Sequence, residues 1–206
     1  MNSLCVRGLI KRYPKFTLEN VSFSLGEGRI MGLIGRNGAG KSTTLKAILN
    51  LVPADAGEIE VLGRSFAENE AECKQQVGVV FGGIDFYMQK RLSEITGVTR
   101  RFYEHWDEAM YERLMDEFEL DSSKRVRELS AGMRVKYMIA LSLSHGARLL
   151  ILDEPTSGLD GRNMRLIAER LKSEARSGRT ILVITHDREL IESCCDNIVE
   201  VEKRSS

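Results

Sequence analysis

The sequence predicts an α/β fold with a mostly parallel sheet, an antiparallel β subdomain near the N-terminus and an inserted α-helical subdomain. Three continuous apolar runs rich in β-branched residues, 30–34, 149–152 and 181–184, are typical of parallel strands that are covered on both faces. Residues 21–25 instead alternate apolar and polar side chains, which indicates a half-buried strand. The stretch 92–144 has apolar residues at helical spacing and no convincing strand.

Shorter patterns supply the remaining elements. Weaker strand candidates span residues 6–10, 59–62 and 77–81. A helix is expected over 42–51, directly after a glycine-rich loop. A second helix is expected over 163–176, where Gly178 can end it in a left-handed conformation.

The length of 206 residues is ample for one domain with an inserted subdomain. We expect a single domain over 1–206, with a core from 1–83 and 146–206 and a helical subdomain over 84–145. The chain carries 30 Lys and Arg residues against 30 Asp and Glu residues. This zero formal charge argues against a nucleic-acid partner, which would require a basic balance or a basic patch.

No apolar run approaches the roughly 20 residues needed to span a bilayer, and the first residues lack the charged and apolar regions of a signal peptide. We therefore expect the chain to stay in the cytosol, so that any membrane role requires a partner that spans the membrane. The four cysteines are Cys5, Cys73, Cys194 and Cys195. Their spacing is not that of a metal site, and we expect reduced structural thiols.

Residues 35–43 match the pattern GxxxxGK[ST] between the expected strand 30–34 and the expected helix 42–51. Glycines allow the backbone to wrap closely around phosphate oxygens, and the amides at the start of the helix point at the anion. Lys41 can reach the β- and γ-phosphates, and the Ser42 hydroxyl can hold Mg²⁺. The residues predicted to contact a nucleotide are Gly35, Arg36, Asn37, Gly38, Ala39, Gly40, Lys41, Ser42 and Thr43.

The strand 149–152 ends in two carboxylates, Asp153 and Glu154. Neighbouring strand residues point to opposite sides, so the two acids can serve different roles. We expect Asp153 to hold Mg²⁺ through water at the carboxyl edge of the sheet, and Glu154 to orient the attacking water as general base. His186 follows the strand 181–184 and can donate to a γ-phosphate. A lone histidine at a strand end is more often a cap or a surface residue.

The order and spacing of these motifs resemble those of ATP-binding cassette domains over nearly the whole chain. The resemblance rests on the segments 35–43, 129–133 (Leu-Ser-Ala-Gly-Met), 149–154 and 157–160 (Ser-Gly-Leu-Asp), and on His186. The segment 129–133, which is similar to LSGGQ, separates this family from other phosphate-loop ATPases. The resemblance implies an ATPase that uses ATP and Mg²⁺, with Glu154, His186 and Lys41 in catalysis.

The resemblance also implies a head-to-tail dimer with a second copy or with a homologous subunit. Each ATP would lie between the phosphate loop of one chain and Ser130 and Gly132 of the other. Ser130 fits the N-terminus of a helix, where its hydroxyl and nearby amides could grip the γ-phosphate. Asp160 resembles the acid that crosses the dimer seam. Tyr13 matches the aromatic residue that stacks on adenine; the alternative is simple packing at a strand end.

The sequence departs from the family pattern in two places. Ala131 replaces a glycine and Met133 replaces a glutamine; alanine is small enough for close backbone approach, so we expect function to survive. The larger departure is that Gly82 and Gly83 stand where the family has a glutamine that contacts Mg²⁺ and senses the γ-phosphate. The candidates for a substitute are Asp85 and, as the weaker one, Gln89.

Six aromatic residues gather near the start of the helical subdomain, although aromatic residues make up only 6% of the chain. They are Phe86, Tyr87, Phe102, Tyr103, Trp106 and Tyr111. In cassette transporters this subdomain carries the groove that receives a helix of the membrane subunit, and aromatic residues are enriched where proteins dock. The alternative is that these side chains fill the core of the subdomain.

The helical subdomain resembles that of bacterial exporter-type cassettes whose ATPase and membrane subunits are separate chains. We therefore expect an ATPase subunit that drives a separate transmembrane permease, with export as the implied direction, from the cytoplasmic face of the cell membrane. Two alternatives stay open. One is a soluble ATPase of the same family, for example in iron–sulfur cluster assembly; the other is a nucleotide sensor without hydrolysis, favoured by the missing glutamine.

Overall fold

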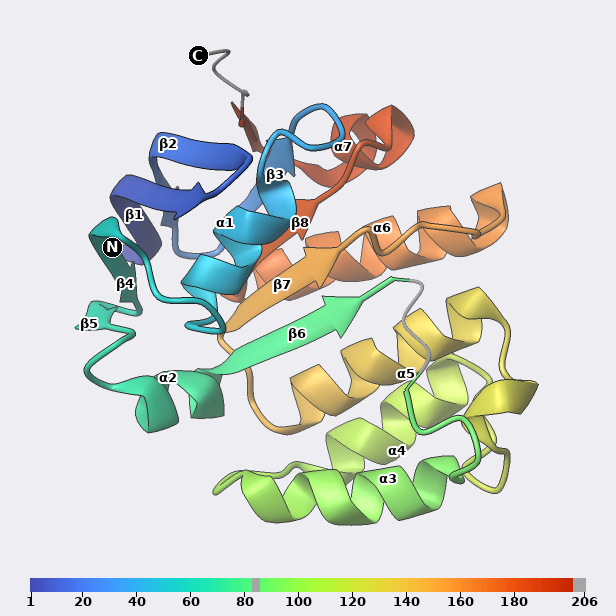
Figure 1. Ribbon diagram of the computed structural model, residues 1–206. Helices are drawn as coiled ribbons and strands as arrows, with labels where there is room; N and C mark the ends of the chain where they lie inside the picture. Colours follow the sequence, from blue (N-terminus) through green and yellow to red (C-terminus); the bar gives the residue numbers. More distant parts are fainter. Residues whose placement is uncertain (83–85, 202–206) are drawn as a thin grey trace.

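The computed structural model of the chain describes residues 1–82 and 86–201. Its strands form an antiparallel sheet of order β2-β1-β4-β5 and a parallel sheet of order β6-β7-β8-β3-β9 (Figure 1). The antiparallel sheet contains β1 (Asn2–Tyr13), β2 (Phe16–Gly26), β4 (Ala56–Val61) and β5 (Arg64–Ser65). The parallel sheet contains β3 (Ile30–Ile34), β6 (Val77–Phe81), β7 (Leu149–Asp153), β8 (Thr180–Ile184) and β9 (Asn197–Glu200). The predicted fold class is confirmed.

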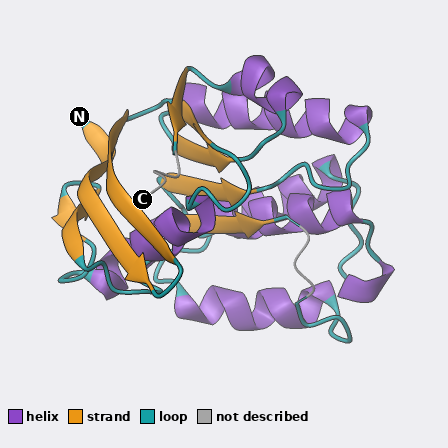
Figure 2. Ribbon diagram, turned by 45° about the horizontal axis from the view of Figure 1, so that its top comes forward, coloured by secondary structure: helices purple, strands orange, loops and turns teal. Residues whose placement is uncertain are grey.

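The parallel sheet separates two hydrophobic cores, and helices lie on both of its sides (Figure 2). The helices that cover it include α1 (Lys41–Ile48), α5 (Ala131–Ser144) and α6 (Gly161–Arg176). Leu150 and Leu152 of β7 face the core that contains residues of α5 and α6. Leu149 and Ile151 face the core that contains residues of α1 and of the antiparallel sheet. Because both faces of β7 are buried, its sequence is continuously apolar rather than alternating.

Elements without a strong apolar pattern are the ones that the sequence did not predict. The helix α2 (Glu70–Gln76) buries only Cys73 among its residues. The strand β9 is short and largely exposed, and it is held by parallel pairing with β3. Asp187 caps α7 (Arg188–Cys194) through its side chain. Gly178 follows the end of α6 with a φ of 99°, as expected for a glycine at this place.

The described chain between β6 and β7 is helical. It contains α3 (Leu92–Thr99), η1 (Arg100–Phe102), α4 (Glu108–Glu117) and η2 (Val126–Glu128), followed by α5. The buried Thr96 hydroxyl lies 2.8 Å from the hydroxyls of both Tyr111 and Tyr137, which links α3, α4 and α5. Since α5 packs against β6 as well as α4, the boundaries 84–145 stay a prediction. No helix within residues 1–82 and 86–201 is both long and apolar enough to cross a membrane.

Candidate functional site

The loop between β3 and α1 encloses the ammonium group of Lys41. Lys41 is the first residue of α1, and its Nζ donates hydrogen bonds to the carbonyl oxygens of Gly35 at 2.7 Å and Arg36 at 3.4 Å. The preceding Gly40 has a φ of 114°, and a Cβ there would lie 2.6 Å from Cδ1 of Leu18. Glycine therefore fits this position far better than any other residue, and the loop closes tightly over the start of the helix.

The loop and the end of β7 line one pocket of about 460 Å³. Its lining residues are Phe16, Arg36, Asn37, Gly38, Gly40, Lys41, Ser42, Thr43, Asp153 and Glu154. This volume is within the range of small-molecule sites. Of the predicted loop residues, Gly35 and Ala39 do not line the pocket, and the Ala39 side chain is instead buried in a hydrophobic core. The structure thus brings the loop and both predicted carboxylates to one place.

Asp153 is the last residue of β7; it is partly buried and lines this pocket. Burial raises the pKa of this carboxyl group, the charge of Glu154 raises it further, and the charge of Lys41 lowers it. A carboxylate that is removed from water gains from a nearby cation. Together with the Ser42 hydroxyl, Asp153 offers the oxygen ligands that Mg²⁺ prefers, so these two residues fit the predicted metal.

Glu154 leaves the strand in an unusual backbone conformation. Its φ is 46°, in the left-handed region that non-glycine residues seldom adopt. The amide of Glu154 donates to the Ile184 carbonyl at 2.8 Å, and its carbonyl accepts from the Ser157 amide at 3.1 Å. Because Glu154 lies beyond the end of β7, the alternation of strand side chains does not set its direction, and both acids line the same pocket. Strained backbone of this kind often occurs at functional sites.

Two residues that follow β8 hold the Glu154 carboxylate. The Thr185 hydroxyl donates to Oε2 at 3.0 Å, and Nδ1 of His186 lies 2.9 Å from Oε1. Thr185 is fully buried, and its hydroxyl oxygen accepts from the Asp187 amide at 3.1 Å. This second bond leaves the hydroxyl proton free to point at Glu154. His186 was predicted from the sequence, whereas Thr185 was not, because its only signal is a hydroxyl between the apolar strand and the histidine.

An aromatic pair lies near the pocket at the hairpin between β1 and β2. The ring of Tyr13 stacks on that of Phe16, with centroids 6.4 Å apart and planes at 25°. Phe16 lines the pocket, whereas Tyr13 does not. The Lys11 ammonium lies 5.7 Å from the centroid of the Tyr13 ring. Phe16 was not predicted from the sequence, because nothing in an alternating strand distinguishes it from a core residue.

The segment 129–133 and the segment 157–160 pack against each other, away from the pocket. Ser130 caps α5, as expected, and its hydroxyl accepts from the Met133 amide at 3.2 Å. Asp160 caps α6 by accepting from the Asn163 amide at 2.8 Å. A Cβ on Gly132 would lie 3.2 Å from Cδ2 of Leu159, which places the two segments in contact. Ser130, Gly132 and Asp160 do not line the pocket of the same chain.

The position of the missing glutamine is occupied by tightly packed backbone. The Gly82 amide donates to the Asp153 carbonyl at 2.7 Å. Gly83 and Asp85 lie outside the described residues. The side chain of Gln89 accepts a hydrogen bond from Arg127 at 3.1 Å and is not among the residues that line the pocket.

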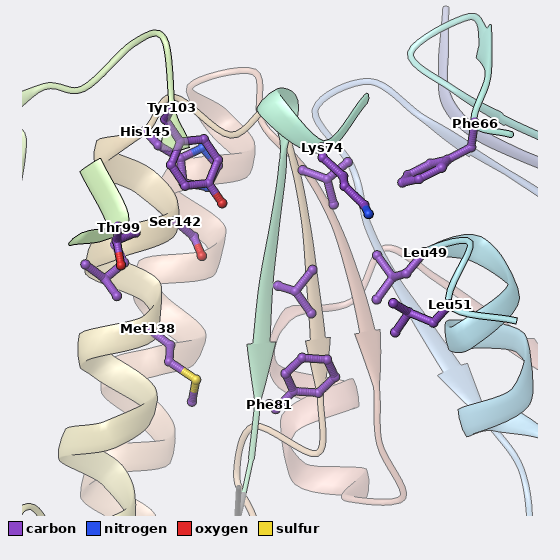
Figure 3. Close-up of a pocket in the computed structure, with 13 residues that line it drawn as sticks. Leu49, Leu51, Phe66, Lys74, Phe81, Thr99, Tyr103, Met138, Ser142 and His145 are labelled. Carbon is purple, nitrogen blue, oxygen red and sulfur yellow. The ribbon is translucent and has the colours of Figure 1, made fainter. Parts of the chain in front are cut away.

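A second cavity, of about 370 Å³, lies between the helical residues 99–145 and the residues 49–81, and we call it the interlobe groove. Its lining residues are Leu49, Leu51, Phe66, Lys74, Val77, Val79, Phe81, Thr99, Tyr103, Met138, Leu141, Ser142 and His145. Figure 3 shows that the helical residues and the core residues form two walls on opposite sides of β6. The His145 ring stacks on Tyr103, with centroids 3.7 Å apart and planes at 9°. Burial lowers the pKa of His145 to about 4.

The six aromatic residues of this region divide between the two predicted roles. Tyr111 is buried, and Phe86 and Trp106 pack against the same hydrophobic core. Tyr103 lines the interlobe groove. Tyr87 and Phe102 are exposed at 71% and 72%. Part of the cluster therefore fills the core, and part of it is available at the surface.

A glycine loop between a parallel strand and a helix, with a carboxylate pair at the end of a second parallel strand, defines a phosphate-loop nucleotide-binding protein. The family model described as ABC transporter matches residues 18–157. The chain belongs to the ABC transporter family.

Relatives and solved structures agree with this assignment. The chain is 37% identical over 207 residues to the Nod factor export ATP-binding protein I of Ralstonia nicotianae, covering 97% of this chain and 64% of the relative. It is 36% identical to the protein of the same name from Rhizobium meliloti, covering 96% of this chain and 61% of the relative. A solved structure described as the ATP binding subunit of an ABC transporter is 32% identical, with a TM-score of 0.87, covering 97% of this chain and 85% of that one.

Proposed function

We propose that this chain binds and hydrolyses ATP as the motor subunit of an ABC transporter. The observation that carries the proposal is the single pocket that contains Lys41, Ser42, Asp153 and Glu154. A cation, a hydroxyl, a partly buried carboxylate and a hydrogen-bonded carboxylate are the groups that phosphoryl transfer to water requires. Membership of the family and the names of the relatives support the same function.

The phosphate loop would bind the triphosphate. In the structure Lys41 donates to the carbonyls of Gly35 and Arg36. In the complex with ATP, its ammonium would instead donate to the β- and γ-phosphates. The loop amides and the N-terminus of α1 would complete the cradle. Ser42 and Asp153 would hold Mg²⁺, which neutralises charge on the phosphates.

Glu154 would act as the general base. Its carboxylate would orient the attacking water and accept one proton from it as the water oxygen bonds to the γ-phosphorus. The bond from this phosphorus to the β,γ-bridging oxygen would break, and ADP would leave with that oxygen. Thr185 and His186 hold the two carboxylate oxygens in the structure, so the base has a defined direction before the nucleotide arrives. His186, which is exposed in the single chain, would donate to the γ-phosphate.

The adenine would lie on the aromatic pair near the hairpin. Tyr13 is 39% exposed, and its ring stacks on Phe16, which lines the pocket. Stacking on such a ring is worth about 1–3 kcal/mol per base in nucleic-acid complexes. The position of Phe16 between Tyr13 and the phosphate loop supports this orientation of the nucleotide.

A second copy or a homologous subunit would complete the site. Ser130 caps the 14-residue helix α5, and an anion at such an N-terminus is stabilised by the free amides and the helix dipole. Since Ser130 and Gly132 do not line the pocket of their own chain, a head-to-tail pair would use them on the nucleotide of the partner. Asp160, in the adjoining segment, would lie at the seam between the two copies.

A separate transmembrane subunit would dock in the interlobe groove. The groove is lined mainly by apolar side chains. Leu51, which lines it, is 58% exposed, and Phe102, which precedes the lining residue Tyr103 in the chain, is 72% exposed. Apolar and aromatic surface of this kind suits an inserted helix. The word export in the names of the relatives supports an exporter, with this chain on the cytoplasmic face of the membrane.

Phosphate release by the purified chain with ATP and Mg²⁺ tests the catalytic part. We expect turnover in the wild type and a loss below detection in Lys41→Ala, because the phosphates lose their cation. Lys46→Ala is the matched control, since Lys46 is an exposed lysine on the same helix. Unchanged turnover in Lys41→Ala would refute the assignment of the phosphate loop, and no turnover in the wild type would favour the nucleotide sensor.

Copurification from cell membranes tests the coupling to transport. We expect the tagged chain to sediment with membranes and to bring with it a protein that has several membrane-spanning segments. A chain that stays in the supernatant and brings no such protein, while it still hydrolyses ATP, would favour the soluble ATPase instead.

A further inference from the structure

Gly82 and Glu154 meet where two neighbouring strands end. In the parallel pairing of β6 with β7, Val80 lies beside Leu152 and Phe81 lies beside Asp153. Gly82 and Glu154 are the next residues on the two chains. The Gly82 amide continues the ladder by donating to the Asp153 carbonyl at 2.7 Å, so the contact is an extension of the sheet.

There is no room for a side chain at position 82. A Cβ on Gly82 would overlap the carbonyl oxygen of Glu154 and would lie 2.6 Å from its carbonyl carbon. It would also lie 3.2 Å from the carbonyl oxygen of Asp153. All three neighbours are backbone atoms, which cannot rotate away as the end of a flexible side chain can. Any other residue at this position therefore requires the backbone of Glu154 or that of Gly82 to shift.

The Glu154 peptide is fixed on its other sides. Glu154 has a φ of 46°, and two backbone hydrogen bonds hold this conformation. Its amide donates to the Ile184 carbonyl, and its carbonyl accepts from the Ser157 amide. Its carboxylate is bound by Thr185 and His186. A displacement of this peptide by a few tenths of an ångström or more would therefore be passed to the carboxylate, because interiors this tightly packed transmit strain.

We propose that Gly82 is a positioning residue for Glu154: its lack of a side chain allows the end of β6 to hold the peptide of the catalytic base. The inference rests on the proposed function of Glu154 as the base. It also gives the departure from the family pattern a physical meaning. In this chain the position after β6 supports the base through backbone contact, and a glutamine placed there would disturb the base instead of restoring a contact to the nucleotide.

Steady-state ATP hydrolysis by Gly82→Ala and Gly82→Gln tests the proposal. We expect kcat to fall by about 100-fold in both, since a misplacement of about 1 Å has this effect on a catalytic group. KM for ATP should stay within about threefold, because the phosphate loop is unchanged. The matched control is Gly78→Ala on the same strand, where a Cβ would lie 2.6 Å from Cβ of Ser142 and far from Glu154 in the ladder.

The outcomes separate this inference from the proposed function. Full turnover in Gly82→Ala, higher turnover in Gly82→Gln, or an equal loss in Gly78→Ala would overturn the role of Gly82. If the wild type does not hydrolyse ATP, the proposed function fails, and amide hydrogen exchange decides the inference. Exchange of the Ser157 amide, which donates to Glu154, should then be faster in Gly82→Ala and unchanged in Gly78→Ala; unchanged exchange in both would overturn it.

A folding defect in Gly82→Ala has its own test. In the double variant Gly82→Ala/Glu154→Gly, the residue at position 154 adopts the left-handed region without cost and can yield to the added methyl group. We expect this double variant to fold. A double variant that fails to fold as the single one does would show that freeing the backbone at position 154 does not relieve the strain, and would overturn the proposal.

Discussion

The phosphate-loop pocket and the interlobe groove are both lined by described residues, and different interactions hold their walls. Polar groups in the pocket have defined partners: Lys41 binds loop carbonyls, and Glu154 is bound by Thr185 and His186. The groove is lined largely by apolar side chains from separate parts of the chain. Directional bonds can fix a catalytic geometry, whereas apolar walls can adapt to the shape of a partner.

Two elements extend from one surface to the other. Helix α1 begins at Lys41 in the pocket, and Leu49 directly after it lines the groove. Val77, Val79 and Phe81 of β6 line the groove, and Gly82, directly after this strand, lies against the backbone of Glu154. A partner helix that docks in the groove would therefore act on the same elements that we propose to hold the phosphates and the base. Under that proposal, α1 and β6 would couple hydrolysis to the membrane partner.

We expect the largest change in activity from a substitution that replaces the base in the pocket and leaves the groove unchanged. Glu154→Gln should lower kcat by about 1,000-fold, because general-base catalysis contributes roughly 10² to 10⁴, and should still bind ATP. Phosphate release and ATP binding by isothermal titration calorimetry measure the two quantities. The control is Glu192→Gln, an exposed glutamate of α7. Normal hydrolysis by Glu154→Gln would show that another group is the base.

The next effect concerns the wall of the groove. Burial lowers the pKa of His145 to about 4, whereas an unfolded histidine has a pKa of about 6.5. Below pH 6.5 the unfolded chain binds a proton that the folded chain does not, so stability is full above pH 6.5 and falls as the pH approaches 4. By linkage we expect a loss of about 2 kcal/mol between pH 7.5 and pH 5.

Urea unfolding at the two pH values, with His145→Gln as the matched variant, measures this loss. The variant should lose less stability than the wild type by about the same 2 kcal/mol. Equal losses in the two proteins would show that His145 does not carry this pH dependence.

A charged side chain placed in the groove should weaken the binding of the proposed membrane partner. Leu51→Arg should lower the affinity for the membrane partner by about 10-fold or more, because a desolvated guanidinium replaces apolar contact. Cosedimentation with membranes measures it. Ile198→Arg is the control, because Ile198 on β9 is 53% exposed, close to the 58% of Leu51, and lies outside the groove. Equal retention of the two variants on membranes would mean that the groove is not the docking surface.

The smallest effect refines the geometry of the pocket. Thr185→Val removes the hydroxyl that donates to Glu154 at 3.0 Å, and one such bond to a charged group is worth about 1.5 kcal/mol, or roughly 10-fold in kcat. Thr185→Ser keeps the hydroxyl and should recover most of the turnover. A serine variant as slow as the valine variant would indicate that Thr185 acts through packing alone.

The difference between the pocket and the groove also explains which features could be predicted from the sequence. The pocket comes from short contiguous motifs at strand ends, so the loop and the carboxylates were predictable residue by residue. The strands with continuous apolar runs were predictable for the same reason, since burial on both faces leaves a clear pattern. Predictions failed where the pattern is weak, as in α2 and β9, which carry few buried side chains.

Other parts of the site depend on contacts that no local pattern records. The groove is assembled from separate segments, and its stacked pair joins Tyr103 to His145. Thr185 and Phe16 became visible only through their neighbours in space. Gly82 was noticed in the sequence as a missing glutamine, yet only the structure shows that the Glu154 backbone fills the space beside it.

We propose that ATP is held between the phosphate loop of one copy and the Ser130 segment of another. Sedimentation velocity of Glu154→Gln with ATP and Mg²⁺ tests it most directly, because bound ATP persists when hydrolysis stops. We expect a shift from monomer to dimer that depends on ATP and disappears in Glu154→Gln/Ser130→Arg. A protein that binds ATP and stays monomeric, or a dimer that the Ser130 substitution leaves intact, would contradict it.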